Sequence, residues 1–450
     1  MKKSAIVLAC LLWFTLSVNA QQARSDIKAN VNLAASNYLA YPGPQKKLSP
    51  APAGYEPFYI SHYGRHGSRY TIGKDSYNIP YFTLLKADSL GKLTPRGKEV
   101  LFIIKQLRDM GLSREGELTL LGAQQHRDIA RRMYERFPQV FNGNTHIDAK
   151  STVVIRCILS MENALQQLLV YNPKLDIRHD ASRHDMYYMN DEHNAYDKLR
   201  HYKLSKDTLK AFNARHSNSD HLMSVLFNDS EFVKSIDRGR FVSELFKQAK
   251  NLQSTDLRNK YSLWNIFSDD EIYNFWQMDY AGWYVYGGPN KLNKGAGMYT
   301  QLNLVKNIIE TADTCIRLPH PGATLRYAHE SDVMPLVCLL NLNGFGNPVD
   351  NLDDLAYRVG TDTKYSPWPA MYSLFSIKTS VLLRANKCRT PTFLSKCCSM
   401  KTRQPSPLKP IVLLITIGRT CVPTCNSAWL RHRLYSRKVI ACKAGNVVAS

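Results

Sequence analysis

The stretch that decides the fold is Pro57-Phe58-Tyr59-Ile60-Ser61-His62-Tyr63, followed directly by Gly64-Arg65-His66-Gly67-Ser68-Arg69. Residues 57–63 are mostly aromatic and β-branched, a composition that predicts a buried strand. The strand runs straight into a polar turn flanked by glycines, and an open α/β sheet places its chemistry at such a strand end. We therefore expect residues 64–69 to form part of a functional site.

Further strands and helices alternate along the chain. Residues 151–156 and 323–328 read as strands because β-branched and apolar residues dominate them. Helical spacing of apolar residues predicts helices over the stretches 95–110, 119–136 (with Thr119 as its N-cap), 161–169 and 333–342. This alternation predicts an α/β fold with a parallel or mixed sheet.

The length of 450 residues indicates one large domain with an insertion, or two domains. Residues 176–290 are polar, aromatic and helical in pattern, and we interpret them as an α-helical insertion. The α/β core then consists of residues 21–175 and 291–358.

The N-terminus has the pattern of a secretory signal peptide. Lys2 and Lys3 precede an apolar run over residues 5–18, and residues 18–20 offer the small side chains that a signal peptidase reads. We predict that residues 1–20 are removed and that the protein is periplasmic or secreted, with outer-membrane vesicles as a further destination. An uncleaved anchor is the alternative. No later apolar run is long enough to span a membrane.

Residues 359–450 form a basic, cysteine-rich tail. Residues 361–450 hold 15 Lys and Arg but one acidic residue, so +14 of the formal charge of +22 lies there, together with six of the ten cysteines. The tail also lacks the binary patterning of a globular sequence. We hypothesise a change of reading frame near residue 358, so that the tail is translated out of frame. A genuine accessory tail is the alternative.

Side chains suited to a phosphoryl group gather at three predicted strand ends. They are Arg65, His66 and Arg69 after the first strand, Arg156 at the end of the second, and His329 and Glu330 after the third. Guanidinium groups bind phosphate oxygens in pairs, and a neutral imidazole can attack phosphorus. A carboxylic acid can protonate the leaving alcohol, and its carboxylate can then activate water. Each motif alone could be a surface turn, a solvated charge or a helix start, but their joint occurrence favours a site.

These motifs carry a family resemblance. Arg65-His66-Gly67-Ser68-Arg69 resembles the Arg-His-Gly-x-Arg signature of the histidine acid phosphatase branch of the histidine phosphatase superfamily. Supporting matches are Leu118-Thr119-Leu120-Leu121-Gly122, Arg156-Cys157-Ile158-Leu159-Ser160, and His329-Glu330 before Met334-Pro335-Leu336. Over residues 55–355 the chain looks most like the bacterial multiple inositol polyphosphate phosphatases, which are phytases.

The resemblance implies a phosphoglycerate-mutase-like core. Its central mixed, mostly parallel sheet is flanked by helices, and the helical insertion forms a lid over the site. The implied roles are His66 as nucleophile, Arg65, Arg69, Arg156 and His329 as phosphate-binding residues, and Glu330 as proton donor. The resemblance implies no metal and no cofactor.

The chain departs from the family pattern at two places. Thr71 stands where the family signature has proline. His329-Glu330-Ser331 stands where acid phosphatases have His-Asp and inositol polyphosphate phosphatases usually have His-Ala-Glu. The second departure bears on the role of Glu330 as the acid.

We therefore expect an exported phosphomonoesterase that hydrolyses inositol polyphosphates through a phosphohistidine. The alternatives are a phosphatase of broad specificity for sugar phosphates or nucleotides, and an inactive or poorly folded protein that binds inositol phosphates. A basic protein suits a polyanionic small molecule through electrostatic steering. The candidates for holding its other phosphates are Lys74, Arg183, Lys291 and Lys294.

Two other classes of partner are not favoured. The run His179-Asp180, His184-Asp185 and His193 is too irregularly spaced for a metal site, and the pair Cys421 and Cys425 lacks a second pair. The basic tail lacks the regular interleaving of aromatic and basic residues that is expected of a protein binding single-stranded nucleic acid. Cys157, Cys315 and Cys338, the cysteines of residues 21–358, are odd in number, which argues against a fully paired disulfide set.

Overall fold

The computed structural model describes residues 23–41, 43, 55–190, 203–315, 317–349, 351–356, 378–385, 411–417 and 420–424, the last three segments by their backbone alone. The predicted signal peptide, His193 and Cys425 lie outside the described residues. Within the described part, no helix combines the length and the apolar character that crossing a membrane requires.

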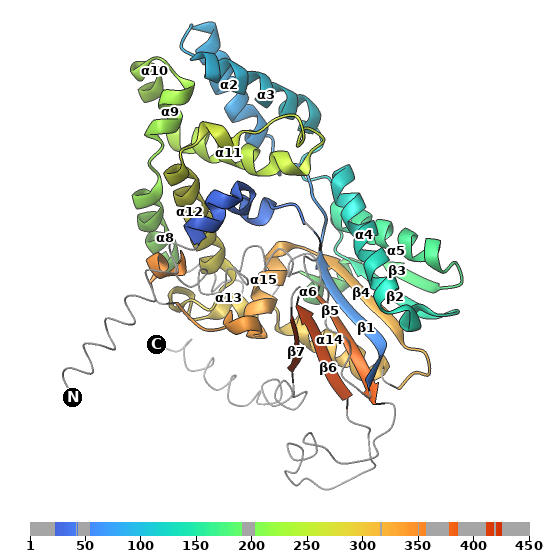
Figure 1. The fold of residues 1–450 in the computed structure, drawn as a ribbon. Coiled ribbons are helices and arrows are strands. Elements are labelled where there is room, and N and C mark those ends of the chain that lie inside the picture. The colour runs from blue at the N-terminus through green and yellow to red at the C-terminus, as the bar shows by residue number, and fades with distance from the viewer. Residues whose placement is uncertain are drawn as a thin grey trace, which may run out of the picture.

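A seven-stranded sheet forms the centre of the fold (Figure 1). Its strands are β1 (Tyr55–Arg65), β2 (His146–Ser151), β3 (Asp176–Asp180), β4 (Gly322–Ala328), β5 (Lys378–Ala385), β6 (Ile411–Ile417) and β7 (Thr420–Thr424). Their order is β3-β2-β4-β1-β5-β6-β7, with the first four parallel and the last three antiparallel. The expected mixed sheet is confirmed.

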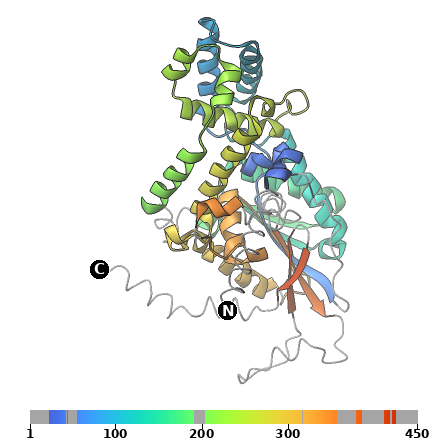
Figure 2. The same cartoon turned by 60° about the vertical axis from the view of Figure 1, so that its left-hand side comes forward.

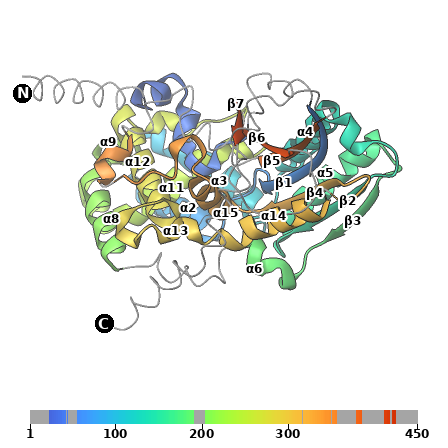
Figure 3. The same cartoon turned by 90° about the horizontal axis from the view of Figure 1, so that it is seen from below.

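Helices cover both faces of the sheet (Figure 3). Helices α4 (Leu120–Arg136) and α5 (Ile155–Tyr171) lie on one face, and α14 (Leu302–Cys315) and α6 (Met186–Met189) on the other. Along β4, Leu325 and Tyr327 pack with the α4–α5 side. Arg326 points the opposite way and donates to Asn307 of α14. The whole of β4 is therefore buried, as expected for a central parallel strand.

A helical part stands above the sheet (Figures 1 and 2). Its helices are α2 (Asp75–Ser89), α3 (Pro95–Gly111), α8 (Lys203–His216), α9 (Asp220–Leu226), α10 (Ser230–Ser235), α11 (Arg238–Asn251) and α12 (Asp269–Gly287). Helix α2 packs against α3 and α11, and α3 packs against α9. Residues 75–111, which the sequence analysis placed in the α/β core, thus join the helical part. Conversely, β3 lies within residues 176–290, which were predicted to form the helical insertion, but it is an edge strand of the sheet.

Shorter elements connect these layers. They are a helix at residues 23–29, α13 (Ala296–Tyr299), α15 (Glu330–Leu339), and the 3-10 helices η1 (Val31–Tyr38), η2 (Pro138–Phe141), η3 (Arg183–Asp185), η4 (Leu252–Ser254), η5 (Trp264–Ile266), η6 (Lys291–Asn293), η7 (Leu342–Gly344) and η8 (Leu352–Asp354).

Local sequence explains how α4 begins. Thr119 caps this helix as predicted, because its hydroxyl accepts a hydrogen bond from Gly122 N at 3.2 Å. The predicted strand over residues 151–156 is wrong. Strand β2 lies earlier, over a stretch whose alternate residues Ile147, Ala149 and Ser151 are buried, and α5 begins at Ile155. The alternating burial of a half-buried strand, rather than its β-branched content, marks β2.

Register places the carboxyl ends of the parallel strands together. Arg65 at the end of β1 pairs with Ala328 at the end of β4, and Ser151 at the end of β2 pairs with Tyr327. One residue later, His66 N donates to Ala328 O at 2.9 Å. The segments that begin at His66, His329 and Thr152 therefore leave the sheet at one edge.

Candidate active site

The turn after β1 is held from both sides by neighbouring helices. Gly67 N donates to Ser160 Oγ of α5 at 3.1 Å, and Ser68 N donates to Gln125 Oε1 of α4 at 2.8 Å. The Thr119 backbone N–H and hydroxyl both donate to Ser68 O, at 2.9 and 3.0 Å. These bonds fix the backbone on either side of the His66 side chain.

Two glycines allow the turn to approach α4 this closely. A Cβ added to Gly67 would lie 2.4 Å from Gly122 O, and one added to Gly122 would lie 2.2 Å from Ser68 O. Both distances are well below van der Waals contact with backbone atoms. The motifs around Arg65 and Leu118 are therefore two halves of one packed turn.

The Glu330 carboxylate lies at the centre of the site. Oε2 lies 3.1 Å from Arg65 Nε and 3.2 Å from His66 Nε2, within ion-pair distance but without hydrogen-bond alignment. Oε1 lies 3.4 Å from Arg69 Nη2 and accepts a hydrogen bond from Asn37 Nδ2 at 3.1 Å. The structure thus brings the predicted acid against the predicted nucleophile and two of the three predicted arginines.

The ring of His66 is oriented by its own turn. Its Nδ1 lies 2.8 Å from Gly67 O, and because a carbonyl oxygen can only accept, Nδ1 carries the proton. In the neutral ring, Nε2 therefore has the free lone pair and points toward Glu330. This is the tautomer that a nucleophilic imidazole needs.

Burial and neighbouring charges determine the protonation states of His66 and Glu330. Burial lowers the pKa of His66 well below its usual range, against the opposing effect of Glu330. Burial would raise the pKa of Glu330, but the charges of Arg65 and Arg69 hold it well below its usual range. Without a bound ligand the site thus contains a neutral imidazole and a carboxylate. That carboxylate occupies the position in which an anion would meet Arg65 and Arg69.

His329 and Arg156 form the second half of the site. The His329 ring is 5.7 Å from the His66 ring between centroids, and its Nδ1 lies 3.4 Å from Arg156 Nη2. On its other edge, Nε2 lies 3.1 Å from Thr152 Oγ1. Burial, with Arg156 next in importance, lowers the pKa of His329 to about 4. Arg156 joins the site from the first turn of α5, not from a strand end as the sequence analysis predicted.

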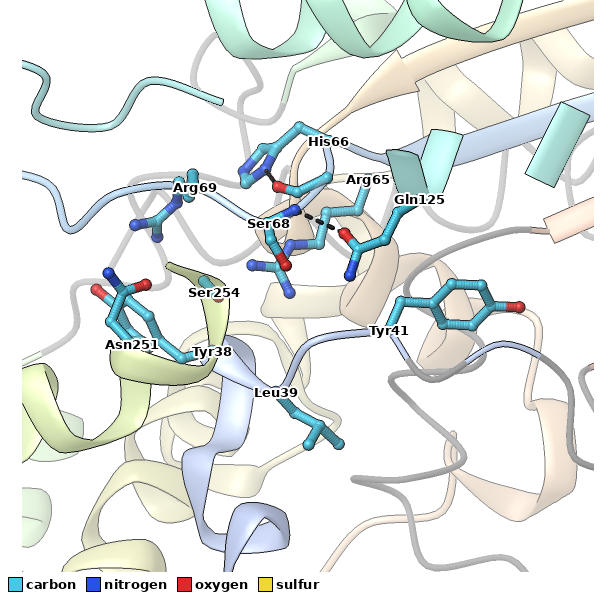
Figure 4. A pocket seen from close by; sticks show the side chains of 11 residues that line it. Tyr38, Leu39, Tyr41, Arg65, His66, Ser68, Arg69, Gln125, Asn251 and Ser254 are labelled. Atoms are coloured by element: carbon cyan, nitrogen blue, oxygen red, sulfur yellow. Dashed lines mark hydrogen bonds between the residues drawn. The ribbon is translucent and has the colours of Figure 1, made fainter. Parts of the chain in front are cut away.

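Two hollows adjoin these residues. A cleft of about 470 Å³ is lined by Arg156, Arg183, Trp283, His329 and Glu330, among others. The small pocket of Figure 4 has a space of about 20 Å³, which suits a water molecule rather than a substrate. It is lined by Tyr38, Leu39, Tyr41, Arg65, His66, Gly67, Ser68, Arg69, Gln125, Asn251 and Ser254.

Of the four cations suggested for further phosphates, the structure places one beside the site. Arg183, in η3, lines the large cleft together with Arg156. Lys74, Lys291 and Lys294 are not among the described residues that line this cleft or the small pocket.

Several residues that hold the site together were not predicted from the sequence. Gln125 and Thr152 lie close to recognised motifs, so the motif neighbourhoods could have pointed to them. Asn37 and Tyr38 lie in the leader before β1 and have no local signal, since Asn37 meets Glu330 across 293 residues.

Neither metal ligation nor disulfides are apparent in the described part of the chain. No three of its described His, Cys, Asp and Glu side chains are grouped so that they could hold a metal ion. No disulfide bond joins any two of Cys157, Cys315 and Cys338.

Comparison with known proteins gives a family match and a set of similar structures. Residues 64–375 match the model of the histidine phosphatase superfamily (branch 2). The fold is similar to that of the Bifidobacterium longum multiple inositol polyphosphate phosphatase in complex with inositol hexasulfate, with a TM-score of 0.65, 15% identity, and coverage of 87% of this chain and 92% of that chain. It is also similar to the D. castellii phytase, with a TM-score of 0.55, 13% identity, and coverage of 88% and 81%. No curated protein sequence matches the chain.

Proposed function

Because the chain belongs to branch 2 of the histidine phosphatase superfamily, we propose that it is an exported phosphatase that removes phosphate from inositol polyphosphates through a phosphohistidine on His66. The family match confirms the family that the sequence predicted, and with it the class of phosphoric monoester hydrolases. The match and the similar structures also confirm the predicted fold. The finer proposal also draws on the similar structures, which include a phytase and an inositol polyphosphate phosphatase with inositol hexasulfate bound.

The observation that carries the proposal is the contact between His66 and Glu330, which lies between the guanidinium groups of Arg65 and Arg69. The neutral His66 directs its Nε2 lone pair at the point where Arg65 and Arg69 hold a carboxylate. A substrate phosphate brings more oxygens and more charge than that carboxylate, so it would displace Glu330 from the two guanidinium groups. Arg156 and His329 adjoin the same point.

The reaction then proceeds in two steps. His66 Nε2 donates its electron pair to phosphorus, the ester P–O bond breaks, and the leaving oxygen takes a proton from Glu330. Water then attacks the phosphohistidine and gives a proton to the Glu330 carboxylate. The P–N bond breaks, and its electron pair returns to Nε2. The arginines stabilise the charge on the transferring phosphoryl group.

Glu330 must gain a proton before the first step. In the ligand-free site its pKa is held low by Arg65 and Arg69. A bound phosphate recruits both guanidinium groups and adds negative charge nearby, and both changes raise the carboxyl pKa. Substrate binding therefore prepares the acid that the leaving oxygen needs.

The large cleft is the proposed place for the rest of the substrate. It begins at Arg156, His329 and Glu330, and Arg183 stands on its wall. A guanidinium there suits a second phosphate of a polyphosphorylated ring. We expect Arg183→Ala to raise KM for inositol hexakisphosphate more than for a substrate with one phosphate.

The proposed activity is tested by phosphate release from inositol hexakisphosphate, with glucose 6-phosphate and AMP as comparison substrates. The wild-type protein should prefer the inositol phosphate, and His66→Ala should abolish release from all three. A preference for the other substrates would favour a phosphatase of broad specificity. Tight binding of inositol hexakisphosphate without any release would favour an inactive binding protein.

Export is proposed from residues 1–20 alone, which lie outside the described residues. Cell fractionation followed by N-terminal sequencing tests it. We expect a mature N-terminus near Gln21 in the periplasmic or secreted fraction, and an uncleaved Met1 in the cell interior would refute export.

A further inference from the structure

The leader before β1 enters the active site. Its 3-10 helix η1 packs against α11 and α12 of the helical part, and Figure 2 shows it between those helices and the sheet. At its start, Asn32 Oδ1 accepts a hydrogen bond from Trp264 Nε1 at 3.1 Å. Just beyond its end, Ala40 N donates to Gln253 Oε1 at 3.0 Å. The segment is thus fixed at both ends to the helical part.

Between these two anchors the segment meets the catalytic groups. Asn37 Nδ2 donates to Glu330 Oε1 at 3.1 Å, in a buried contact. The ring of Tyr38 lies 5.0 Å from Arg69 Cζ and 5.2 Å from Lys250 Nζ, at distances typical of cation–π contacts. Figure 4 shows Tyr38 beside Arg69 at the edge of the small pocket.

The backbone is strained at the residue that turns Asn37 toward the site. Ser36 has φ 57° and ψ −132°, and its side chain is fully buried. A residue other than glycine is held in such a conformation only where its surroundings determine it, and such positions are concentrated at functional sites. The strain and the contact with Glu330 are separate observations that point to the same place.

We propose that Asn37 is a positioning residue for the acid–base step, an inference that rests on the function proposed above. Its amide donates to Oε1, so Oε1 serves as the acceptor of this contact and the proton of Glu330 is left to Oε2. Oε2 is the oxygen that faces His66 Nε2. Asn37 thereby holds the carboxyl group by Oε1 and leaves the protonated Oε2 free to meet the leaving oxygen, which departs on the side of phosphorus opposite to His66 Nε2.

A comparison of leaving groups tests this role. An alkyl phosphate such as 2-glycerophosphate needs its leaving oxygen protonated, whereas p-nitrophenolate leaves without a proton. We expect Asn37→Ala to lower kcat/KM on 2-glycerophosphate about 10-fold, and on p-nitrophenyl phosphate less than about 2-fold. Glu330→Gln should show the same selectivity with a loss of about 100-fold or more on the alkyl substrate.

Two further variants separate this role from packing. Asn37→Leu is close in size but has no donor and adds no charge, so it should reproduce the selective loss. Asn32→Ala removes a hydrogen bond of the same length from the same segment, without touching Glu330, and should leave the ratio of the two kcat/KM values unchanged.

Each outcome has one meaning. Equal losses on both substrates in the Asn37 variants, or a wild-type ratio in Asn37→Leu, would overturn the positioning role even if the enzyme is active. A wild-type protein that releases phosphate from neither substrate nor from inositol hexakisphosphate would instead refute the proposed function.

Discussion

Two buried histidines should make the fold sensitive to acid. His62 on β1 and His126 on α4 both lie against Tyr327, with ring centroids 5.4 and 5.6 Å away. Burial lowers the pKa of each to about 3, and His126 adds to this effect at His62. His126 is also hydrogen-bonded to the backbone of Arg65, next to the nucleophile.

The direction of the pH effect follows from which state binds protons. An unfolded histidine takes up its proton below a pH of about 6.5, whereas these two stay neutral in the folded state down to about 3. The stabilisation is fully present above a pH of about 6.5 and is lost as the pH falls toward 3. At pH 4.5, roughly two units below the unfolded pKa, each histidine costs about 2–3 kcal/mol.

Together the two histidines cost about 5 kcal/mol at pH 4.5, against a total stability of roughly 5–15 kcal/mol for a typical domain. We therefore predict partial or complete unfolding at pH 4.5. The replacement His126→Gln removes one titrating group and keeps an N–H donor. The variant should lose about 2–3 kcal/mol less than wild type between pH 7.5 and 4.5.

The assay is equilibrium urea unfolding at both pH values. His221→Gln, which replaces an exposed histidine on α9, serves as the control and should follow the wild type. An equal loss of stability in wild type and His126→Gln would show that His126 is not held neutral in the folded protein, and the reasoning from burial would fail.

Three other predictions concern the packed turn, His329 and the tail. Gly122→Ala should lower the melting temperature and reduce activity about 100-fold, because the added Cβ would lie 2.2 Å from Ser68 O. Gly282→Ala in α12 is the control, since a Cβ there meets nothing within 4 Å, and it should change neither the melting temperature nor the activity. Thr152→Val should lower kcat/KM about 10-fold without changing thermal stability by more than ~1 kcal/mol, since it removes the 3.1 Å contact with His329 Nε2. For the tail, translation of the other two reading frames of the gene after residue 358 should yield a family-like strand and a closing helix; if neither frame does, the frame hypothesis is wrong.

The local parts of the site could be predicted because their signals are local. Strand β1 and the turn after it form one continuous motif, and β4 runs directly into His329 and Glu330. Parallel pairing of two buried strands then places both turns at one sheet edge. The contact between His66 and Glu330 follows from that topology.

The secondary structure around Arg156 was predicted wrongly from the local sequence. Its β-branched neighbours predicted a strand, but pairing with β4 ends at Ser151 and a helix begins four residues later. Composition suggested the wrong element, yet the guanidinium still reaches the site, because α5 begins at the same sheet edge. The element was therefore wrong while the position was right.

Long-range contacts had no signal in the sequence. The bond between Asn37 and Glu330 joins residues that are 293 apart, and nothing in the leader marks Asn37. The packing of α2 and α3 against α9 and α11 is of the same kind, since amphipathic helices show which face is buried but not which partner buries it.

The tail calls for one correction. The family resemblance was expected over residues 55–355, and the family match continues to residue 375. Strands β5, β6 and β7 add an antiparallel extension to the sheet beside β1. The hypothesis of a changed frame near residue 358 remains a prediction.

The central claim is that His66 Nε2 receives the phosphoryl group, and trapping the phosphoenzyme tests it most directly. Glu330→Gln mixed with p-nitrophenyl phosphate should form the phosphohistidine but hydrolyse it slowly, because the base for water is missing. We predict that an alkaline quench followed by peptide mass spectrometry finds the phosphate on His66. Phosphate on another residue, or product formation in a single turnover without any phosphorylated peptide, would contradict the account.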